Sequence, residues 1–311
     1  MAASRSNPRV LIVTPEVTYL PPGMGNIANY LSAKAGGLAD VSAALISKLF
    51  ALGADVHVAL PDYRGIFHRN IGGALRQLYQ KELDTYMKYL PEERLHLAED
   101  RAFYYVHHVY SDFSQENLKI ALAFQREVIN NILPRVKPDM IHCNDWMTGL
   151  IPGYSRTVQI PSLFTIHNIH TVKATLAEIE DRGIDAAGFW QNLFYENMAV
   201  DYKQTRDANP VDFLVSGVFG AHFVNTVSPA FLSEIVSGRH GFISEDLRRE
   251  LVNKAEADCA YGILNAPDPS YEPSSDPELF RNYTAGDHAA GKRANKSYLQ
   301  KRLGLIQDAE A

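Results

Sequence analysis

The amino-acid sequence predicts an α/β fold with a doubly wound, mostly parallel sheet that carries helices on both faces. Short β-branched runs alternate with segments in which apolar residues recur every three or four positions, the patterns of buried strands and amphipathic helices. Polar residues follow several of the strand-like runs directly. Because open sheets of this class bind ligands in the crevice beyond the carboxyl ends of their strands, these polar residues predict a site there.

The first part of the chain forms a compact strand, helix, strand unit. Its first β-branched run is closed by Pro15, and Gly53 ends its helix. The long loop between them mixes prolines, glycines and aromatic residues, which favours an ordered excursion over a flexible linker. The expected elements are a strand over 9–14, a loop over 18–32, a helix over 38–52 and a strand over 55–61.

The same alternation returns in the second part of the chain. The expected elements there are a helix over 116–136 and strands over 138–143, 162–166 and 222–227. Three of these strands end directly in polar groups, which are Asn144-Asp145-Trp146, His167-Asn168 and Ser228. Several strands that end independently in such residues favour a binding site over a featureless scaffold.

A glycine-rich junction precedes the first expected helix. The segment Lys34-Ala35-Gly36-Gly37-Leu38-Ala39-Asp40-Val41 places a lysine and two adjacent glycines where the loop turns into the helix. Glycine can adopt positive φ and let a ligand approach closely, and the N–H groups of a first helical turn attract an anion. Lys34 would add a mobile cation. The same residues could also form a glycine-softened helix start with a solvated lysine, because short glycine-rich motifs often match by chance.

Composition excludes several classes of function. The 311 residues include 30 Lys and Arg against 36 Asp and Glu, a formal charge of -6, so no overall basic field is present for nucleic acid or an anionic membrane. The two cysteines, Cys143 and Cys259, lie far apart and fit core positions in a reducing compartment. Without an apolar leader or a run of about eighteen apolar residues, we expect a soluble, cytoplasmic protein that does not enter a membrane.

We expect no bound metal. The eleven histidines form no close set with carboxylates, and His107 and His108, if they lie in a strand, point to opposite faces. No pair of carboxylates stands at a spacing typical of a hydrolase, which makes a glycosidase a weak hypothesis.

Taken together, the motifs give the chain a family resemblance. It resembles the N-terminal domain of bacterial glycogen synthases and plant starch synthases, retaining glycosyltransferases of the GT-B type in which two Rossmann-like domains face a cleft. The matching segments, in order, are Lys34–Val41, Pro138–Leu150, Thr165–Asn168, Thr226–Ile235 and a closing segment with Gly262–Asn265, Asp276 and Lys292–Leu305. Five ordered motifs are far more specific than any one of them, and they cover nearly the whole chain.

Four segments depart from the family pattern. The differences are a longer loop over 17–33, Asn144 and Met147 where many members carry histidine, Ile169-His170-Thr171 in place of Tyr-Gln-Gly, and Ala266-Pro267 after Asn265 in place of Gly-(Val/Ile). They cluster near the acceptor and sugar sites that the resemblance implies. We therefore expect them to affect glucan preference and activity more than the phosphate cradle.

The resemblance implies a hexosyltransferase. Glucose would pass from ADP-glucose or UDP-glucose to the non-reducing 4-hydroxyl of an α-1,4-glucan with retention, without a metal or other cofactor. Residues 1–311 would form a single Rossmann-like, acceptor-side domain with an inserted loop at 17–33, and the C-terminal nucleotide-sugar domain would be absent from this chain. We therefore expect the isolated chain to fold but not to transfer glucose, because one wall of the cleft is missing.

The predicted site contains nine residues. The catalytic residues are His167, Asp145 and Lys34; the donor phosphates are assigned to Lys34, Gly36 and Gly37; and the sugar or acceptor to Asp40, Asp145, Trp146, His167, Asn168 and Asn265. Structural roles remain open for three of them. His167 could be a core histidine at a strand end, Asp40 a charge favoured by the helix dipole, and Trp146 a core aromatic residue.

Two other classes of function are weighed against this hypothesis. A non-catalytic glucan-binding or regulatory module would fit the altered acceptor motifs and the missing half. A nicotinamide-dependent oxidoreductase begins with a similar strand, turn and helix, but the sequence lacks G-x-G-x-x-G directly after its first strand and a persuasive acidic ribose ligand after its second.

Overall fold

The computed structural model describes residues 7–25, 31–70, 94–268 and 271–308. The chain divides into two compact units, Met1–Asn265 and Ala266–Ala311. We predicted a single domain over 1–311, whereas the main sheet lies within the first unit and the second unit is a small helical body.

The first unit is built on a parallel sheet. Its described strands follow the order β3-β2-β1-β4-β5-β8-β9, and each neighbouring pair is parallel. The bounds are β1 Arg9–Val13, β2 Asp55–Pro61, β3 Leu95–Ala98, β4 Met140–Asn144, β5 Ser162–Ile166, β8 Phe223–Thr226 and β9 Ala260–Gly262. The chain builds outwards from β1 on one side and from β4 on the other, so β1 and β4 flank a topological switch point.

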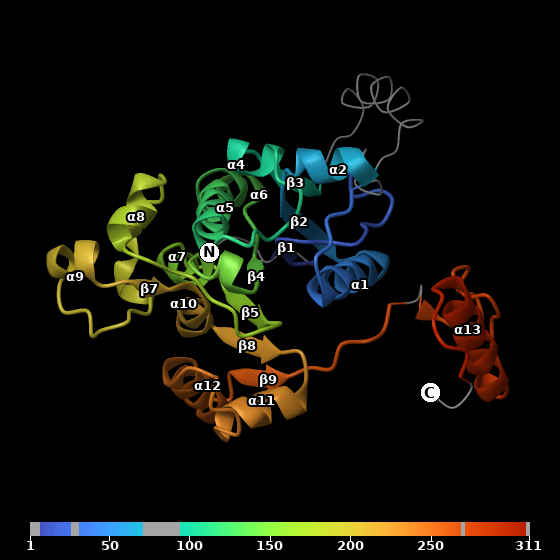
Figure 1. Ribbon diagram of the computed structural model, residues 1–311. Helices are drawn as coiled ribbons and strands as arrows, with labels where there is room; N and C mark the ends of the chain where they lie inside the picture. The colour runs from blue at the N-terminus through green and yellow to red at the C-terminus, as the bar shows by residue number, and fades with distance from the viewer. Residues whose placement is uncertain (1–6, 26–30, 71–93, 269–270, 309–311) are drawn as a thin grey trace, which may run out of the picture. The chain divides into compact units, whose positions relative to one another are not determined.

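Helices surround this sheet (Figure 1). Because crossovers between parallel strands are right-handed, the reversal of winding at the switch point places the connecting helices on opposite faces. The described α-helices of the first unit are α1 Gly37–Ala51, α2 Arg64–Asn70, α4 Arg101–Tyr104, α5 Ser114–Glu127, α6 Leu133–Val136, α7 Ile151–Thr157, α8 Leu176–Asp181, α9 Tyr202–Ala208, α10 Phe213–Gly220, α11 Pro229–Val236 and α12 Glu245–Glu256. The doubly wound, mostly parallel fold predicted from the sequence is confirmed.

Shorter elements complete the unit. They are the antiparallel pair β6 Lys173–Ala174 and β7 Val211–Asp212, the π-helical turn η2 Val128–Ile132, and the 3₁₀ turns η3 Trp146–Thr148, η4 Ala186–Gly188 and η5 Trp190–Asn192. The helix expected over 116–136 is therefore interrupted by η2 between α5 and α6. His107 and His108, for which a strand was considered, lie in an irregular segment between α4 and α5.

The loop expected over 17–33 is closed at its base. Val17 and Ala33 exchange two backbone hydrogen bonds of 2.9 Å each. Leu20, Met24 and Leu31 are buried in the core, so the described part of the loop packs against the protein as predicted for an ordered excursion. Residues 26–30 of this loop lie outside the described residues.

Backbone meets backbone where η3 and α7 pack on α10. A Cβ atom added at Gly149 would lie 1.8 Å from the carbonyl oxygen of Phe213, and one added at Gly220 would lie 2.7 Å from the nitrogen of Gly153. Only glycine permits approaches this close. The segment that follows β4 is thus packed directly against α10.

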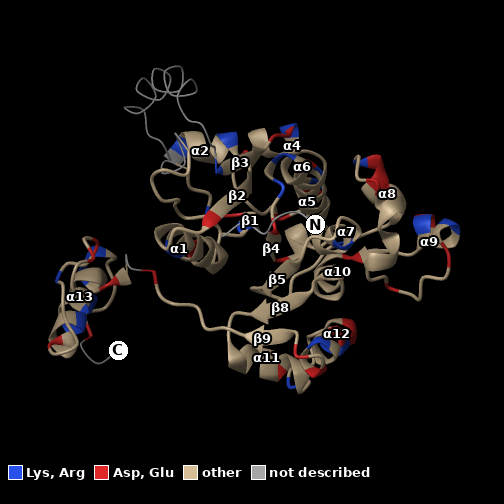
Figure 2. Ribbon diagram, turned by 180° about the vertical axis from the view of Figure 1, so that it is seen from behind, with Lys and Arg blue, Asp and Glu red and all other residues tan. Residues whose placement is uncertain are grey.

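The second unit contains α13, His288–Arg302. The Phe280 and Tyr298 rings stack with their centroids 4.5 Å apart, and the Asn295 side chain bonds both the N–H and the carbonyl of Arg281, at 2.9 and 2.7 Å. Lysine and arginine residues lie along α13, whereas both signs of charge are present on helices of the first unit (Figure 2). Within the residues described, no helix combines the length and apolar character needed to cross a membrane.

Candidate active site

The candidate site lies where β1, β4 and β5 end. Glu16 follows β1, Asp145 follows β4 and His167 follows β5, so neighbouring parallel strands deliver all three to one edge of the sheet. Asp145 and His167 are residues that the sequence analysis singled out. Glu16 is not, although its position shortly after the first strand was a usable signal.

Asp145 organises the turn after β5. Its Oδ1 accepts the backbone N–H of His167 at 2.8 Å, and its Oδ2 accepts Nδ2 of Asn168 at 3.1 Å. The side chain is fully buried, and burial raises the pKa of this carboxyl to about 7. Its backbone has φ 59° and ψ 178°, a conformation that costs a residue with a Cβ roughly 1–3 kcal/mol. The bonds to the turn offset this strain, so Asp145 fixes the positions of His167 and Asn168.

The His167 ring is held through Asn144. Its Nε2 lies 3.0 Å from Asn144 Oδ1, while Asn144 Nδ2 donates to the Val13 carbonyl at 3.2 Å. This second bond orients the amide, and an amide oxygen only accepts, so Nε2 of His167 carries the proton and Nδ1 is left as an acceptor. Burial, with a further contribution from nearby His142, lowers the pKa of His167 to about 4, which keeps the ring neutral near pH 7. Asn144, a departure from the family motif, therefore takes a direct part in this network.

Lys34 is paired at the start of α1. Its Nζ lies 2.7 and 2.8 Å from the two carboxylate oxygens of Asp40, and Asp40 also accepts the Thr18 hydroxyl at 2.6 Å. The side chain of Lys34 remains 38% exposed. The structure therefore shows a cation held beside the helix start, where the sequence analysis expected a mobile one.

The two glycines behave differently from the prediction. Gly36, the N-cap of α1, has φ -151° and ψ -161°, an extended conformation open to any residue. Neither Gly36 nor Gly37 is among the glycines with positive φ, so that part of the prediction is wrong. A Cβ at either position would meet nothing within 4 Å, which shows that the backbone here borders open space. Among the described residues no side chain caps α1, so its first-turn amides have no side-chain acceptor there.

Glu16 holds the amides just before the helix. Its Oε2 accepts the backbone N–H groups of Ala35 at 2.5 Å and Gly36 at 3.0 Å, and its Oε1 accepts the Tyr110 hydroxyl at 3.3 Å. The Glu16 side chain is buried, with 2% of the residue exposed. An internal carboxylate thus occupies part of the amide nest that was predicted to bind an external anion.

The remaining predicted residues lie in different surroundings. Trp146 is buried, with its ring edge against His170 at a centroid distance of 5.2 Å, which favours its core role over a sugar platform. Asn168 is exposed beside His167. Asn265 is also exposed and ends the first unit, and no described hydrogen bond links it to the Asp145 network. The binding roles of all nine residues stay predictions.

A cavity opens beside the Lys34 loop. It has a volume of about 750 Å³ and is lined by Ser32, Lys34, Ala35, Ile66, Arg69, His107, His108, Val109 and Tyr110. His107 and His108 both line it. In the described ranges, no three His, Cys, Asp or Glu side chains are grouped so that they could hold a metal ion.

The end of β2 bears on the oxidoreductase alternative. Asp62, directly after this strand, is buried and accepts Nε of Arg64 at 2.7 Å. Burial raises the pKa of Asp62, and the Arg64 hydrogen bond opposes that rise. An acidic residue engaged in this way is a poor ribose ligand, so its presence does not favour a nicotinamide site.

Fold and site define a class of protein: a Rossmann-like α/β domain whose polar network sits at the switch point of its sheet. The chain belongs to the starch synthase catalytic domain family, whose model matches residues 9–250, more than half of its length. The family resemblance inferred from the motifs is confirmed.

Individual relatives agree with this assignment. The chain is 31% identical over 307 residues to a glycogen synthase of Syntrophotalea carbinolica, covering 89% of this chain and 58% of the relative. It is 32% identical over 305 residues to glycogen synthase 2 of Geobacter metallireducens, covering 88% of this chain and 57% of the relative. The chain thus spans somewhat more than half the length of these relatives.

A solved structure shares the fold. The catalytic domain of starch synthase IV from Arabidopsis thaliana, bound to ADP and acarbose, superposes with a TM-score of 0.66 at 22% identity. The match covers 97% of this chain and 60% of the Arabidopsis chain.

Proposed function

We propose that this chain is the acceptor-side, N-terminal part of a glucosyltransferase of the glycogen and starch synthase type. The donor is ADP-glucose or UDP-glucose, the acceptor is the 4-hydroxyl at the non-reducing end of an α-1,4-glucan, and the product retains the anomeric configuration. Support comes from the family, from relatives named glycogen synthase, and from an Arabidopsis neighbour bound to ADP and acarbose.

One observation carries the proposal. The uncapped start of α1, bordered by open space at Gly36 and Gly37, stands at the same switch point as the ordered Asp145–His167 network. A helix start of this kind suits a diphosphate, because its N–H groups and dipole favour negative charge. A buried network of directed polar groups suits a sugar, because a neutral hydroxyl needs oriented donors and acceptors.

The chemistry of glycosyl transfer matches these two parts. As the bond from glucose to the diphosphate breaks, negative charge grows on the leaving group and positive character grows on the sugar. The α1 amides and Lys34, once it turns from Asp40, stabilise the leaving diphosphate. His167, neutral and with Nδ1 as an acceptor, binds a sugar hydroxyl, while Asp145 keeps His167 in place. This scheme uses no metal ion and no other cofactor, and it operates in the cytoplasm.

Transfer also requires the second wall of the cleft, which we propose is a C-terminal nucleotide-sugar domain. Orientation and electrostatic preorganisation between two surfaces supply most of the rate in such reactions. The test measures incorporation of labelled glucose into glycogen from ADP-glucose and from UDP-glucose. It compares the 311-residue chain with a version extended through a second domain.

We expect transfer by the extended version and none by the 311-residue chain, although the latter melts cooperatively. Robust transfer by the short chain would refute the need for a second domain. Inactivity of both, together with co-sedimentation of the chain with glycogen, would instead support a non-catalytic glucan-binding module.

A further inference from the structure

Glu16 is a carboxylate at the switch point that the proposed chemistry does not use. It is buried at the carboxyl end of β1 and accepts three hydrogen bonds, from Ala35 N, Gly36 N and the Tyr110 hydroxyl. A buried carboxylate is tolerated only when its charge is compensated by such donors. The three bonds join the end of β1 to the glycine-rich loop and to the segment that precedes α5.

The Tyr110 bond extends this connection across the switch point. The Tyr110 ring lies beside Trp146, with centroids 6.2 Å apart, and Trp146 begins the turn after β4. Tyr110 also lines the cavity beside Lys34 and Ala35. Burial raises the pKa of Tyr110, with Glu16 adding to the rise, so its hydroxyl keeps its proton and remains a donor to Glu16. Glu16 is therefore hydrogen-bonded to two residues that line this cavity, Ala35 and Tyr110.

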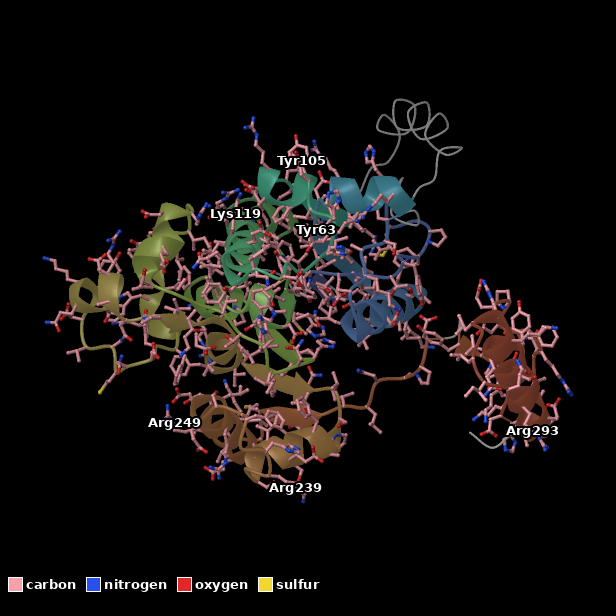
Figure 3. The ribbon with its side chains drawn as sticks, in the orientation of Figure 1. Tyr63, Tyr105, Lys119, Arg239, Arg249 and Arg293 are labelled. Carbon is pink, nitrogen blue, oxygen red and sulfur yellow. The ribbon has the colours of Figure 1, made fainter. Side chains whose placement is uncertain are left out.

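The charge of Glu16 also reaches its neighbours. It contributes to the raised pKa of Asp145, which follows β4, and to the raised pKa of Tyr63, whose buried hydroxyl has no hydrogen-bond partner among the described residues. Figure 3 shows Tyr63 within the body of the first unit, whereas Arg239 lies at its margin. A second anion placed on the amides that Glu16 already holds would meet a like charge in a poorly solvated place.

We propose that Glu16 is a positioning residue that fixes Ala35 and Gly36 and thereby directs a diphosphate to the next amides, those of Gly37, Leu38 and Ala39. This inference rests on the proposed function for the ligand, but the anchoring itself does not. Among the described residues the α1 start has no side-chain cap, and Gly36 and Gly37 border open space, so the three first-turn amides are the ones available to an external anion. Glu16 never touches the reacting atoms in this arrangement.

The anchoring is tested on the 311-residue chain without any ligand. Amide hydrogen exchange at Ala35 and Gly36 is measured by NMR in the wild type, Glu16→Ala and Glu16→Gln. We expect exchange at these two amides to become about tenfold faster or more in Glu16→Ala, because a charge-assisted acceptor is lost. Glu16→Gln retains a carbonyl oxygen that can accept the amides and should restore much of the protection.

Two controls separate anchoring from general damage. Glu99→Gln removes an exposed carboxylate, 69% accessible in its side chain, and should leave exchange at Ala35 and Gly36 unchanged. Exchange in the central strands β1 and β4 reports global stability in every variant. Equal protection of Ala35 and Gly36 in the wild type and Glu16→Ala would overturn the anchoring, as would a loss spread evenly over the sheet.

The directing role is tested with inorganic pyrophosphate, the probe for a diphosphate. In the wild-type chain, we expect titration to shift the amide signals of Gly37, Leu38 and Ala39 more than those of Ala35 and Gly36. Glu16→Gln, which keeps the loop but removes the charge, should lower the Kd severalfold, whereas Glu16→Ala should raise it.

The possible results separate the two claims. Shifts that are largest at Ala35 and Gly36 would mean that the anion displaces Glu16, and they would overturn the directing role. A wild-type chain that does not bind pyrophosphate would count against the donor site in the proposed function, and the positioning role would then be decided by the amide exchange alone.

Discussion

The two sides of the switch point differ in charge: the β1 side holds ionic contacts, whereas the β4–β5 side favours uncharged groups. On the β1 side, Glu16, Lys34 and Asp40 form charged contacts around an open helix start. On the β4–β5 side, burial raises the pKa of Asp145 to about 7 and lowers the pKa of His167 to about 4, which favours the uncharged form of both groups. The comparison shows how one sheet edge can present a charged surface for an anion next to a nearly neutral one for a sugar. Substitutions on each side should therefore have different consequences for stability and for ligand binding.

The largest expected effect concerns Asp145. Asp145→Ala removes the acceptor for the His167 and Asn168 groups and should lower the free energy of unfolding by about 3 kcal/mol. Asp145→Gly loses the same bonds but relieves the strain at φ 59°, so it should be less destabilised than Asp145→Ala by about 1 kcal/mol. Urea denaturation of the three proteins measures both differences. Equal stability of the two variants would show that the backbone there is not strained.

On the β1 side, Lys34→Ala should weaken diphosphate recognition by about 1.5–3 kcal/mol, because a charge-assisted contact is lost. Its effect on folding should stay below about 1 kcal/mol, since the ion pair with Asp40 is partly exposed. Asp40→Asn is the matched variant, because it removes the carboxylate charge that pairs with Lys34 and should tighten pyrophosphate binding. Calorimetric titration with pyrophosphate, alongside thermal melts, distinguishes the two. Unchanged pyrophosphate binding in Lys34→Ala would show that the segment Lys34–Gly37 only begins the helix and is not part of a diphosphate site.

A smaller effect is expected for His167→Ala. In a version extended through a second domain, this change should lower kcat about tenfold with little change in the melting temperature, because the lost interaction is made chiefly in the transition state. Asn144→Ala, which leaves the ring but removes the partner of its Nε2, should lower kcat less. Steady-state kinetics and thermal melts of the two variants and the wild type test this prediction. Wild-type turnover in His167→Ala would exclude the residue from the site, and a collapsed melting temperature would favour a structural role.

The smallest net effect is expected on the pH dependence of the free energy of unfolding, because the titrations of His167 and Asp145 change it in opposite directions. The folded-state pKa of His167 is about 4, below the unfolded value of about 6.5, so its contribution to stability is full above pH 6.5 and is lost as the pH falls towards 4. The folded-state pKa of Asp145 is about 7, above its usual 3.8, so its contribution is full below about pH 4 and is lost as the pH rises towards 7.

Urea denaturation between pH 7.5 and 4.5 tests this balance. Asp145→Asn removes the opposing contribution, so the stability of that variant should fall more steeply with acidification than that of the wild type. Parallel curves for the two proteins would contradict the raised pKa of Asp145.

The sequence was sufficient for the fold because strand and helix patterns are local. β2 and β5 have the predicted bounds, and α1 begins at the glycines as expected. The π-helical turn at Val128–Ile132 was missed because the apolar pattern continues through it, and the edge strand β9 was missed because three residues carry too little periodicity.

For the site, the sequence located the right edge of the sheet but not the pairing of its side chains. Asp145 and His167 were found because they directly follow strands. Glu16 follows one too, yet its bonds reach residues 19 and 94 positions away, which no local pattern encodes. Asn144 was interpreted as a departure from a motif, whereas the structure makes it the partner of His167. Such contacts depend on tertiary packing and become visible only once the strands are paired.

The contacts of Gly149 and Gly220 have a mechanical consequence. Side chains between two elements act as a compressible layer, because they can change rotamer when one element shifts. Between η3, α7 and α10 this layer is missing, since backbone lies directly on backbone. A displacement of α10 therefore moves the turn that carries Asp145 as well, because no layer of side chains lies between them to absorb the shift.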